Sequence, residues 1–162
     1  MLGSFLVTKH FLPTRKPNAS FVAVSTAAVN FPIAMQSGSS AYTSSKLAMI
    51  SFFQFIAAET PDLQVVTIHP GLIDTAMARK SEMIGTLPLD DSKCSSSSSW
   101  NCTNLTVKLP AHFIIWSASK EAAFANGRFL WCNWDVTQLQ ENPKFKEDPL
   151  YCTANILPWP QF

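Results

Sequence analysis

Tyr42 and Lys46 stand four residues apart, at the start of a long stretch with a helical pattern. Because one helical turn takes about 3.6 residues, both side chains would emerge on the same face of the helix. An ammonium held near a phenol favours the phenolate and lowers the pKa of the tyrosine. Such a pair could pass a proton to or from a carbonyl oxygen near neutral pH, as an oxidoreductase requires. The same spacing also occurs on ordinary polar helix faces, so the interpretation depends on the surrounding elements.

The helix expected at 41–59 lies between two short apolar runs, 20–25 and 64–69, that have the composition of buried strands. Strand, helix and strand in this order predict a parallel βαβ unit with a right-handed crossover. A helix at 1–12 and a third strand at 128–133 extend the unit. The predicted fold class is therefore α/β, a partial Rossmann-like doubly wound parallel sheet of about three strands with flanking helices.

Strand ends are where an open α/β sheet binds its ligands, at the C-terminal edge. Ser25 and Thr26 end the first predicted strand, and Tyr42 and Lys46 begin the following helix. We therefore expect the pair and at least one of the two hydroxyls to converge at this edge.

Composition restricts the class of protein. The 162 residues are 47% hydrophobic and 14% charged with a net charge of +1, which predicts one globular domain with a core. The chain has no basic run for a nucleic acid, and its apolar runs are too short to span a membrane. Four cysteines without CxxC spacing give no metal signature and favour reduced thiols, hence a cytoplasmic location.

Two segments do not have the composition of a packed core. The first is about 88–108, where a run of five serines predicts a flexible insertion. The second is 141–162, a tail with several prolines and aromatic residues. The predicted domain therefore covers 1–140 and excludes the tail.

Taken in order, these elements resemble the short-chain dehydrogenase/reductase family. Ser25-Thr26 ends a strand, Tyr42 and Lys46 follow on the next helix, and a Pro70-Gly71 turn follows the next strand. The stretch 127–136, Gly-Arg-Phe-Leu-Trp-Cys-Asn-Trp-Asp-Val, is most similar to fungal members. The resemblance covers about residues 1–140 and implies the C-terminal part of a single NAD(P)-binding Rossmann-like domain.

The resemblance implies an NAD- or NADP-dependent oxidoreductase that interconverts a carbonyl and a secondary alcohol of a small molecule. Tyr42 would be the general acid or base, Lys46 would hold the nicotinamide ribose, and Ser25 or Thr26, with Ser25 preferred, would bind the carbonyl oxygen. The cofactor contacts that the resemblance implies come from Tyr42, Lys46, Pro70, Gly71, Ile73 and Thr75. Thr75 is also a candidate helix N-cap, and His69 is better explained as a strand-end residue than as a base.

The chain departs from the family pattern in two ways. Its five glycines, at positions 3, 38, 71, 85 and 127, form no glycine-rich turn for a cofactor pyrophosphate. The family's catalytic asparagine has no counterpart either, so we expect a truncated chain. The alternative is a catalytically inert fragment that acts as a dimer-forming subunit, because the family's interface helices match 1–12 and 41–59.

Overall fold

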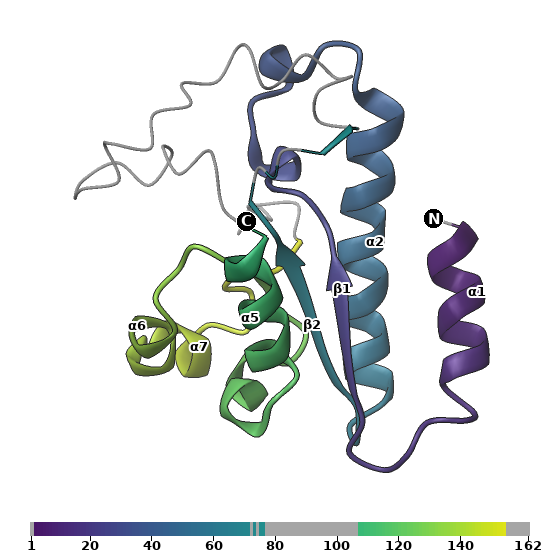
Figure 1. Cartoon of the computed structure of the whole chain (residues 1–162), viewed down its shortest axis with the longest axis vertical. Helices are drawn as coiled ribbons and strands as arrows, with labels where there is room; N and C mark the ends of the chain where they lie inside the picture. The colour runs from purple at the N-terminus through teal and green to yellow at the C-terminus, as the bar shows by residue number, and fades with distance from the viewer. Residues whose placement is uncertain (1, 72, 74, 77–106, 155–162) are drawn as a thin grey trace, which may run out of the picture.

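The computed structural model describes residues 2–71, 73, 75, 76 and 107–154, and its elements form an α/β fold (Figure 1). Most of the predicted serine-rich insertion and the end of the predicted tail, 155–162, lie outside these residues. The strands are β1 (Ser20–Val24), β2 (Gln64–His69) and β3 (Phe129–Trp131). The α-helices are α1 (Leu2–Phe11), α2 (Ser40–Glu59), α5 (Lys108–Ser117), α6 (Val136–Glu141) and α7 (Lys144–Glu147), and the 3-10 helices are η1 (Ala27–Asn30), η2 (Ile33–Gln36) and η3 (Lys120–Ala125).

The three strands form one parallel sheet in the order β1-β2-β3. Val22 of β1 pairs with Val66 of β2, and Ile68 of β2 pairs with Leu130 of β3. The central strand β2 is the most buried, because it has a neighbour on each side and helices on both faces. The predicted parallel sheet and its strand order are confirmed.

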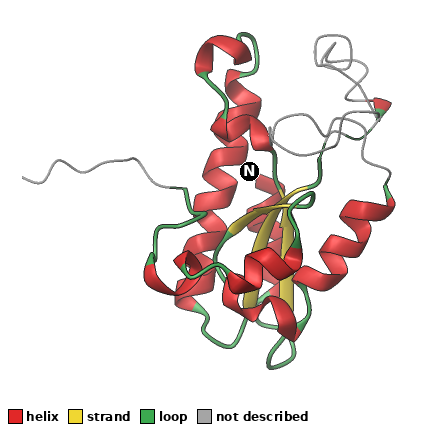
Figure 2. Cartoon of the chain, turned by 90° about the vertical axis from the view of Figure 1, so that its left-hand side faces the viewer, coloured by secondary structure: helices red, strands yellow, loops and turns green. Residues whose placement is uncertain are grey.

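Helices cover both faces of the sheet, as Figure 1 shows. Side chains alternate along a strand, so Phe21 and Val65 point towards α1 and α2, whereas Val66, Ile68 and Leu130 point to the other face. That second face packs against α5, η3, α6 and α7. Figure 2, turned by 90°, looks at the molecule from the side of α5, α6 and α7. The expectation that the first helix and the helix carrying Tyr42 share one face of the sheet is confirmed.

Aromatic rings join α1 to α2 and to the sheet. The ring of Phe5 meets that of Phe52 on α2 edge to face, with centroids 4.4 Å apart. The ring of Phe11 meets that of Phe21 on β1 in the same way at 5.2 Å. Such pairs contribute about 0.5–1.5 kcal/mol each beyond the area that they bury. These contacts hold α1 beside α2 over the first strand.

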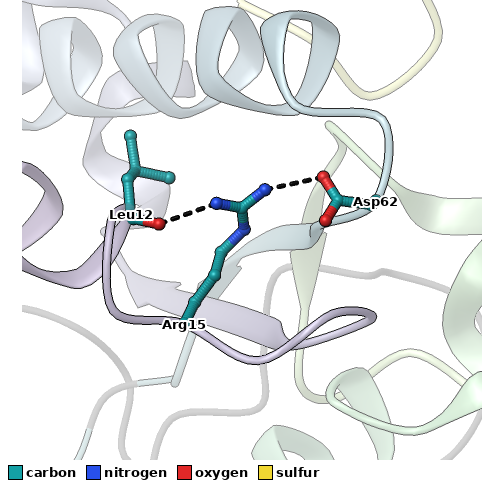
Figure 3. A network of polar contacts seen from close by, with 3 residues as sticks. All are labelled: Leu12, Arg15 and Asp62. Atoms are coloured by element: carbon teal, nitrogen blue, oxygen red, sulfur yellow. Dashed lines mark hydrogen bonds and ion pairs between the residues drawn. The ribbon is translucent and has the colours of Figure 1, made fainter.

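Arg15 links the end of α1 to the turn between α2 and β2 (Figure 3). Its Nη1 donates to the Leu12 carbonyl and its Nη2 to Asp62 Oδ1, each at 2.7 Å. Because Asp62 is exposed, the ion pair itself stabilises the fold by only about 0–1 kcal/mol. The guanidinium also fixes the relative position of two segments, because it bridges the residues that lead into the neighbouring strands β1 and β2.

The segment predicted as a tail packs on the sheet as far as it is described. Phe145 on α7 is buried, and its ring meets those of Phe124 and Tyr151 edge to face. The Phe129 amide of β3 donates to the Cys152 carbonyl at 2.7 Å. This part of the tail therefore belongs to the folded core. Among the described residues, no helix is long and apolar enough to cross a membrane, and no His, Cys, Asp and Glu cluster could hold a metal.

Candidate active site

The first turns of α2 bring Lys46 to the end of β1. Lys46 Nζ donates a hydrogen bond to the Val24 carbonyl at 3.0 Å. Burial lowers the pKa of the Lys46 ammonium from its usual value, because a charged group loses solvation there. The Lys46 ammonium on α2 therefore lies beside Val24, the last residue of β1, at the edge of the sheet where this fold class binds ligands.

Ser25 lies in the same place and is almost completely buried, with 4% of its surface exposed. Its amide donates to the Ile68 carbonyl of β2 at 2.7 Å, so the backbone is fixed by the sheet. Its hydroxyl donates to the Lys46 carbonyl at 3.3 Å. The structure therefore brings the Ser25 hydroxyl to the backbone of Lys46, while the catalytic role of both residues stays a prediction.

The Thr26 hydroxyl has a structural role at the start of η1. Its hydroxyl accepts a hydrogen bond from the Ala28 amide at 3.2 Å and caps η1. Capping uses one lone pair of the oxygen and leaves the O–H able to donate elsewhere. Geometry therefore favours Ser25 for the contact with the α2 turn, while the identity of the catalytic hydroxyl stays a prediction.

Tyr42 lies one turn before Lys46 on α2 and is 40% exposed. Within the described part of the chain its hydroxyl makes no hydrogen bond to Ser25 or Thr26. An exposed phenol at this end of the sheet is accessible to a ligand. Its role as general acid or base stays a prediction.

A polar cluster that the sequence did not reveal fixes the start of α2. The Gln36 side chain donates from Nε2 to the Phe31 carbonyl at 2.7 Å and accepts at Oε1 from the Thr43 hydroxyl at 2.9 Å. The Ser39 hydroxyl donates to the Gln36 carbonyl at 2.8 Å. The segment between β1 and α2 thus contains η1 and η2, and η2 positions the turn that carries Tyr42. A four-residue helix has too few residues to show a hydrophobic period.

His69 ends the central strand next to Ser25, because Val24 is level with Ile68 in the parallel register. Its ring meets the Trp131 ring of β3 edge to face, with centroids 5.1 Å apart. Burial lowers the pKa of His69 to about 4, so the imidazole is neutral at physiological pH. Its Nδ1 is buried and has no hydrogen-bond partner among the described residues. A neutral imidazole thus adjoins the Ser25 position.

Four of the residues predicted to contact a cofactor come soon after the C-terminal end of β2 in the sequence. Gly71 has a φ of +82°, a left-handed conformation that glycine adopts without strain, and it turns the chain after Pro70. Pro70, Gly71 and Ile73 are half-buried and Thr75 is exposed. These four residues therefore lie at the same end of the sheet as Ser25 and Lys46. Their contacts with a cofactor stay predictions.

A comparison with protein-family models matches residues 1–83 to the short chain dehydrogenase family. The match covers β1, α2 and β2, the three elements that carry the site. It also covers all the predicted site residues from Ser25 to Thr75.

Curated fungal proteins resemble a larger part of the chain. A short chain dehydrogenase/reductase of Claviceps purpurea is 36% identical over 104 residues, which are 62% of this chain and 30% of that protein. A short chain dehydrogenase/reductase of Aspergillus aculeatus is 32% identical over 136 residues, 83% of this chain and 42% of that protein. The chain thus spans less than half the length of these two relatives.

Solved structures share the fold at low sequence identity. A short-chain dehydrogenase/reductase from Brucella melitensis, described as a glucose/ribitol dehydrogenase, has a TM-score of 0.61 at 22% identity, over 81% of this chain and 50% of that one. An NADPH-bound carbonyl reductase from chicken fatty liver has a TM-score of 0.58 at 16% identity, over 82% of this chain and 51% of that one. Both likenesses concern the arrangement of strands and helices.

Proposed function

Because the chain belongs to the short-chain dehydrogenase family, we propose that it carries the catalytic groups of a nicotinamide-dependent oxidoreductase that interconverts a carbonyl and a secondary alcohol. The observation that best supports this is the meeting of Lys46 with the end of β1. There its ammonium contacts Val24 and its carbonyl accepts the Ser25 hydroxyl. The NADPH-bound carbonyl reductase with the same fold supports the cofactor and substrate classes. The cytoplasmic location expected from the thiols stays a prediction.

In carbonyl reduction, Tyr42 would donate its phenolic proton to the carbonyl oxygen as charge develops there. The Lys46 ammonium would stabilise the phenolate that remains on Tyr42, because both lie on one face of α2. The Ser25 hydroxyl would turn from the Lys46 carbonyl to donate to the substrate oxygen. In alcohol oxidation each proton moves in the opposite direction.

The nicotinamide end of a cofactor fits the residues present. Lys46 is a half-buried donor that could bind ribose hydroxyls, and the left-handed Gly71 turn lets a planar ring approach the backbone closely. When bound, the reduced nicotinamide supplies the hydride. The pyrophosphate end has no matching glycine-rich turn in the 162 residues.

The dimer-forming alternative has support from one observation. The two helices that the sequence singled out for an interface expose large apolar side chains, among them Leu2 and Val7 on α1 and Phe55 on α2. Exposed apolar side chains gathered on neighbouring helices are typical of surfaces that contact another protein. The proposed chemistry and this surface are compatible, since they lie on different parts of α2.

The nicotinamide half of the proposal can be tested without turnover. We would titrate the 15N-labelled protein with reduced nicotinamide mononucleotide, and with adenosine monophosphate as the matched control. We expect amide shifts at Ser25, Lys46 and Gly71 with the first nucleotide at millimolar concentration and none with the second. Shifts elsewhere, equal shifts with both nucleotides, or no shifts would contradict the proposed site.

A further inference from the structure

The side chain of Gln36 uses both ends of its amide to connect two parts of the segment that leads into α2. Its Nε2 donates to the Phe31 carbonyl at 2.7 Å, and its Oε1 accepts from the Thr43 hydroxyl at 2.9 Å. A carbonyl can only accept, so the contact with Phe31 fixes which end of the amide carries the donors. Gln36 thus connects Phe31, which follows η1, to the first turn of α2.

The first turn of α2 has no ordinary N-terminal cap. The Ser39 side chain at the cap position bonds to no amide of the helix, and the turn contains no acidic residue. The end of an uncapped helix frays, because its first amides have no partner inside the helix. The Ser39 hydroxyl instead donates to the Gln36 carbonyl at 2.8 Å. The turn that carries Tyr42 is therefore held from outside the helix.

A β-turn brings Gln36 to this place. Ser37, with a φ of −53° and a ψ of 132°, and Gly38, with a φ of +83°, match the two central residues of a type II turn. The turn closes where the Ser39 amide donates to the Gln36 carbonyl at 3.0 Å. Because the chain reverses here, the Gln36 side chain reaches Thr43, one helical turn beyond Ser39.

The other end of this connection is tied to the segment just after β1. Thr26 caps η1 by accepting a bond from the Ala28 amide, and the Phe31 amide donates to the Ala28 carbonyl at 3.1 Å. The Phe31 carbonyl then accepts from Gln36. Hydrogen bonds therefore run from the end of β1 to the residue that follows Tyr42.

We propose that Gln36 is a positioning residue for Tyr42, which holds the first turn of α2 at a fixed place relative to the end of β1. The inference rests on the proposed function, in which the Tyr42 phenol donates the proton. A displacement of a reacting group by about 1 Å can remove most of its catalytic effect, so the turn that carries the phenol has to be held. Thr43 transmits the hold, because it is the neighbour of Tyr42 and bonds to Gln36.

Two variants remove the contact and one keeps it. Thr43→Val retains the shape of the side chain but has no hydroxyl to donate, whereas Thr43→Ser retains the hydroxyl. Gln36→Met has a similar length but neither end of the amide. Gln140→Met, on α6, makes the same change at an exposed glutamine whose bond to the Glu121 carbonyl is long, at 3.4 Å, and it serves as the matched control.

The hold on Tyr42 can be measured without a ligand. The chain has two tyrosines, so 13C labelling of tyrosine rings gives two sets of signals, with Tyr151 as the internal reference. We expect 13C relaxation to show a more mobile Tyr42 ring in Gln36→Met and Thr43→Val. In Thr43→Ser and Gln140→Met the ring should move as in the unaltered protein.

Hydrogen exchange measures the same turn through its backbone. The Thr43 amide donates to the Ser39 carbonyl at 2.9 Å, so it is exposed when the turn opens. In the two variants that lack the contact with Gln36, we expect this amide to exchange roughly three- to tenfold faster, the worth of one hydrogen bond. Thr43→Ser should restore the slower exchange.

A split between binding and the response of the phenol links the hold to the proposed chemistry. With reduced nicotinamide mononucleotide, the variants that lack the contact should still shift the Gly71 amide with unchanged affinity. The Tyr42 ring signals, which we expect to shift in the unaltered protein, should respond less. A merely structural loss would weaken both responses together. No response in the unaltered protein would contradict the proposed site alone, since ring mobility reports the hold without a nucleotide.

Equal ring mobility and equal Thr43 exchange in all the proteins would overturn the proposal. A Thr43→Ser variant that behaves as Thr43→Val would do the same, because rescue by the hydroxyl is a direct consequence of the bond to Gln36. Ser39→Ala separates the side chain of Gln36 from its backbone. The Gln36 carbonyl keeps the Ser39 amide in that variant, so we expect little change at Tyr42. A full loss of order there would assign the hold to the β-turn instead.

Discussion

His69 shows how a single buried side chain can set the response of this fold to acid. Its imidazole is neutral because burial lowers its pKa from 6.5 to about 4, and in the described part of the chain its Nδ1 has no partner that would offset a charge. In the unfolded chain the same group would take up a proton near its ordinary pKa. The unfolded state therefore binds more protons between these two values, and the fold loses stability as the pH falls through that window.

When the pH falls from roughly 7 to 5, we expect His69 to lower the free energy of unfolding by about 2 kcal/mol. Urea unfolding at the two pH values would be compared for the unaltered protein and His69→Gln, which cannot be protonated. The loss on acidification should be smaller in the variant by that amount. His10→Gln, at an exposed position, should behave as the unaltered protein does. An identical acid response in all three proteins would show that the pKa of His69 is the same in the folded and unfolded states.

The sequence predicted which residues would lie near the site, but it did not predict the hydrogen bonds that they make. Four-residue spacing placed Tyr42 and Lys46 on one helix face, and the apolar run before it placed Ser25 at a strand end. The bond from Lys46 to the Val24 carbonyl depends on how far α2 begins beyond the strand, which is set by tertiary packing. The role of Gln36 was invisible for the same reason, since its partners lie in a loop without a period.

Among the elements, β1 and β2 match their predicted ranges within a residue, because apolar runs bounded by turns have no good alternative to a buried strand. The third strand is shorter than predicted and ends at Trp131. After it, the Cys132 amide still bonds to the His69 carbonyl, but the chain already turns. The helix α7 was not predicted, because four residues are too few to show a hydrophobic period. In the structure Phe145 packs against the rings around it, and the Lys144 amide donates to Asn142 Oδ1 at 3.0 Å.

Gly127, just before β3, has a backbone conformation that favours glycine. Its φ is +74°, its amide donates to the Val65 carbonyl at 2.7 Å, and an added Cβ would lie 3.4 Å from that of Ala57. We expect Gly127→Ala to destabilise the fold by about 1–2 kcal/mol, because an L-residue is strained in the left-handed region. Gly3→Ala, on α1 with open space around it, should cause no loss. Equal midpoints of denaturant unfolding in the two variants would contradict this view of Gly127.

Asp135 is the residue that starts α6. Its Oδ1 accepts hydrogen bonds from the Thr137 amide at 2.8 Å and the Gln138 amide at 3.2 Å. Removing this cap in Asp135→Ala should cost about 1 kcal/mol of unfolding free energy, whereas Asp135→Asn keeps an acceptor and should lose much less. Thermal unfolding of both variants at one pH would measure the difference. If asparagine and alanine had the same effect, the charge of Asp135 and not its cap would be the stabilising feature.

At the scale of the whole molecule, the chain has residues suited to the nicotinamide end of a cofactor but no glycine-rich turn suited to its pyrophosphate. Lys46, Ser25 and the Gly71 turn lie at the end of the sheet where we propose that the nicotinamide end binds. The pyrophosphate is the most charged part of such a cofactor, and helix N-termini with glycine-rich turns are what bind it. The 162-residue chain has no such turn. Catalytic groups without a positioned hydride donor lose most of their advantage.

We therefore expect the purified 162-residue protein to bind NADH and NADPH weakly or not at all, and to turn over little carbonyl substrate. Calorimetric and fluorescence titrations with both dinucleotides measure the affinity, with reduced nicotinamide mononucleotide as the reference ligand. If the pyrophosphate and adenosine contribute nothing, the dinucleotides should bind no more than a few-fold more tightly than the mononucleotide. Micromolar binding of either dinucleotide by a monomer would mean that backbone amides elsewhere in this chain hold the pyrophosphate. In that case shifts on dinucleotide binding that the mononucleotide does not cause would locate them.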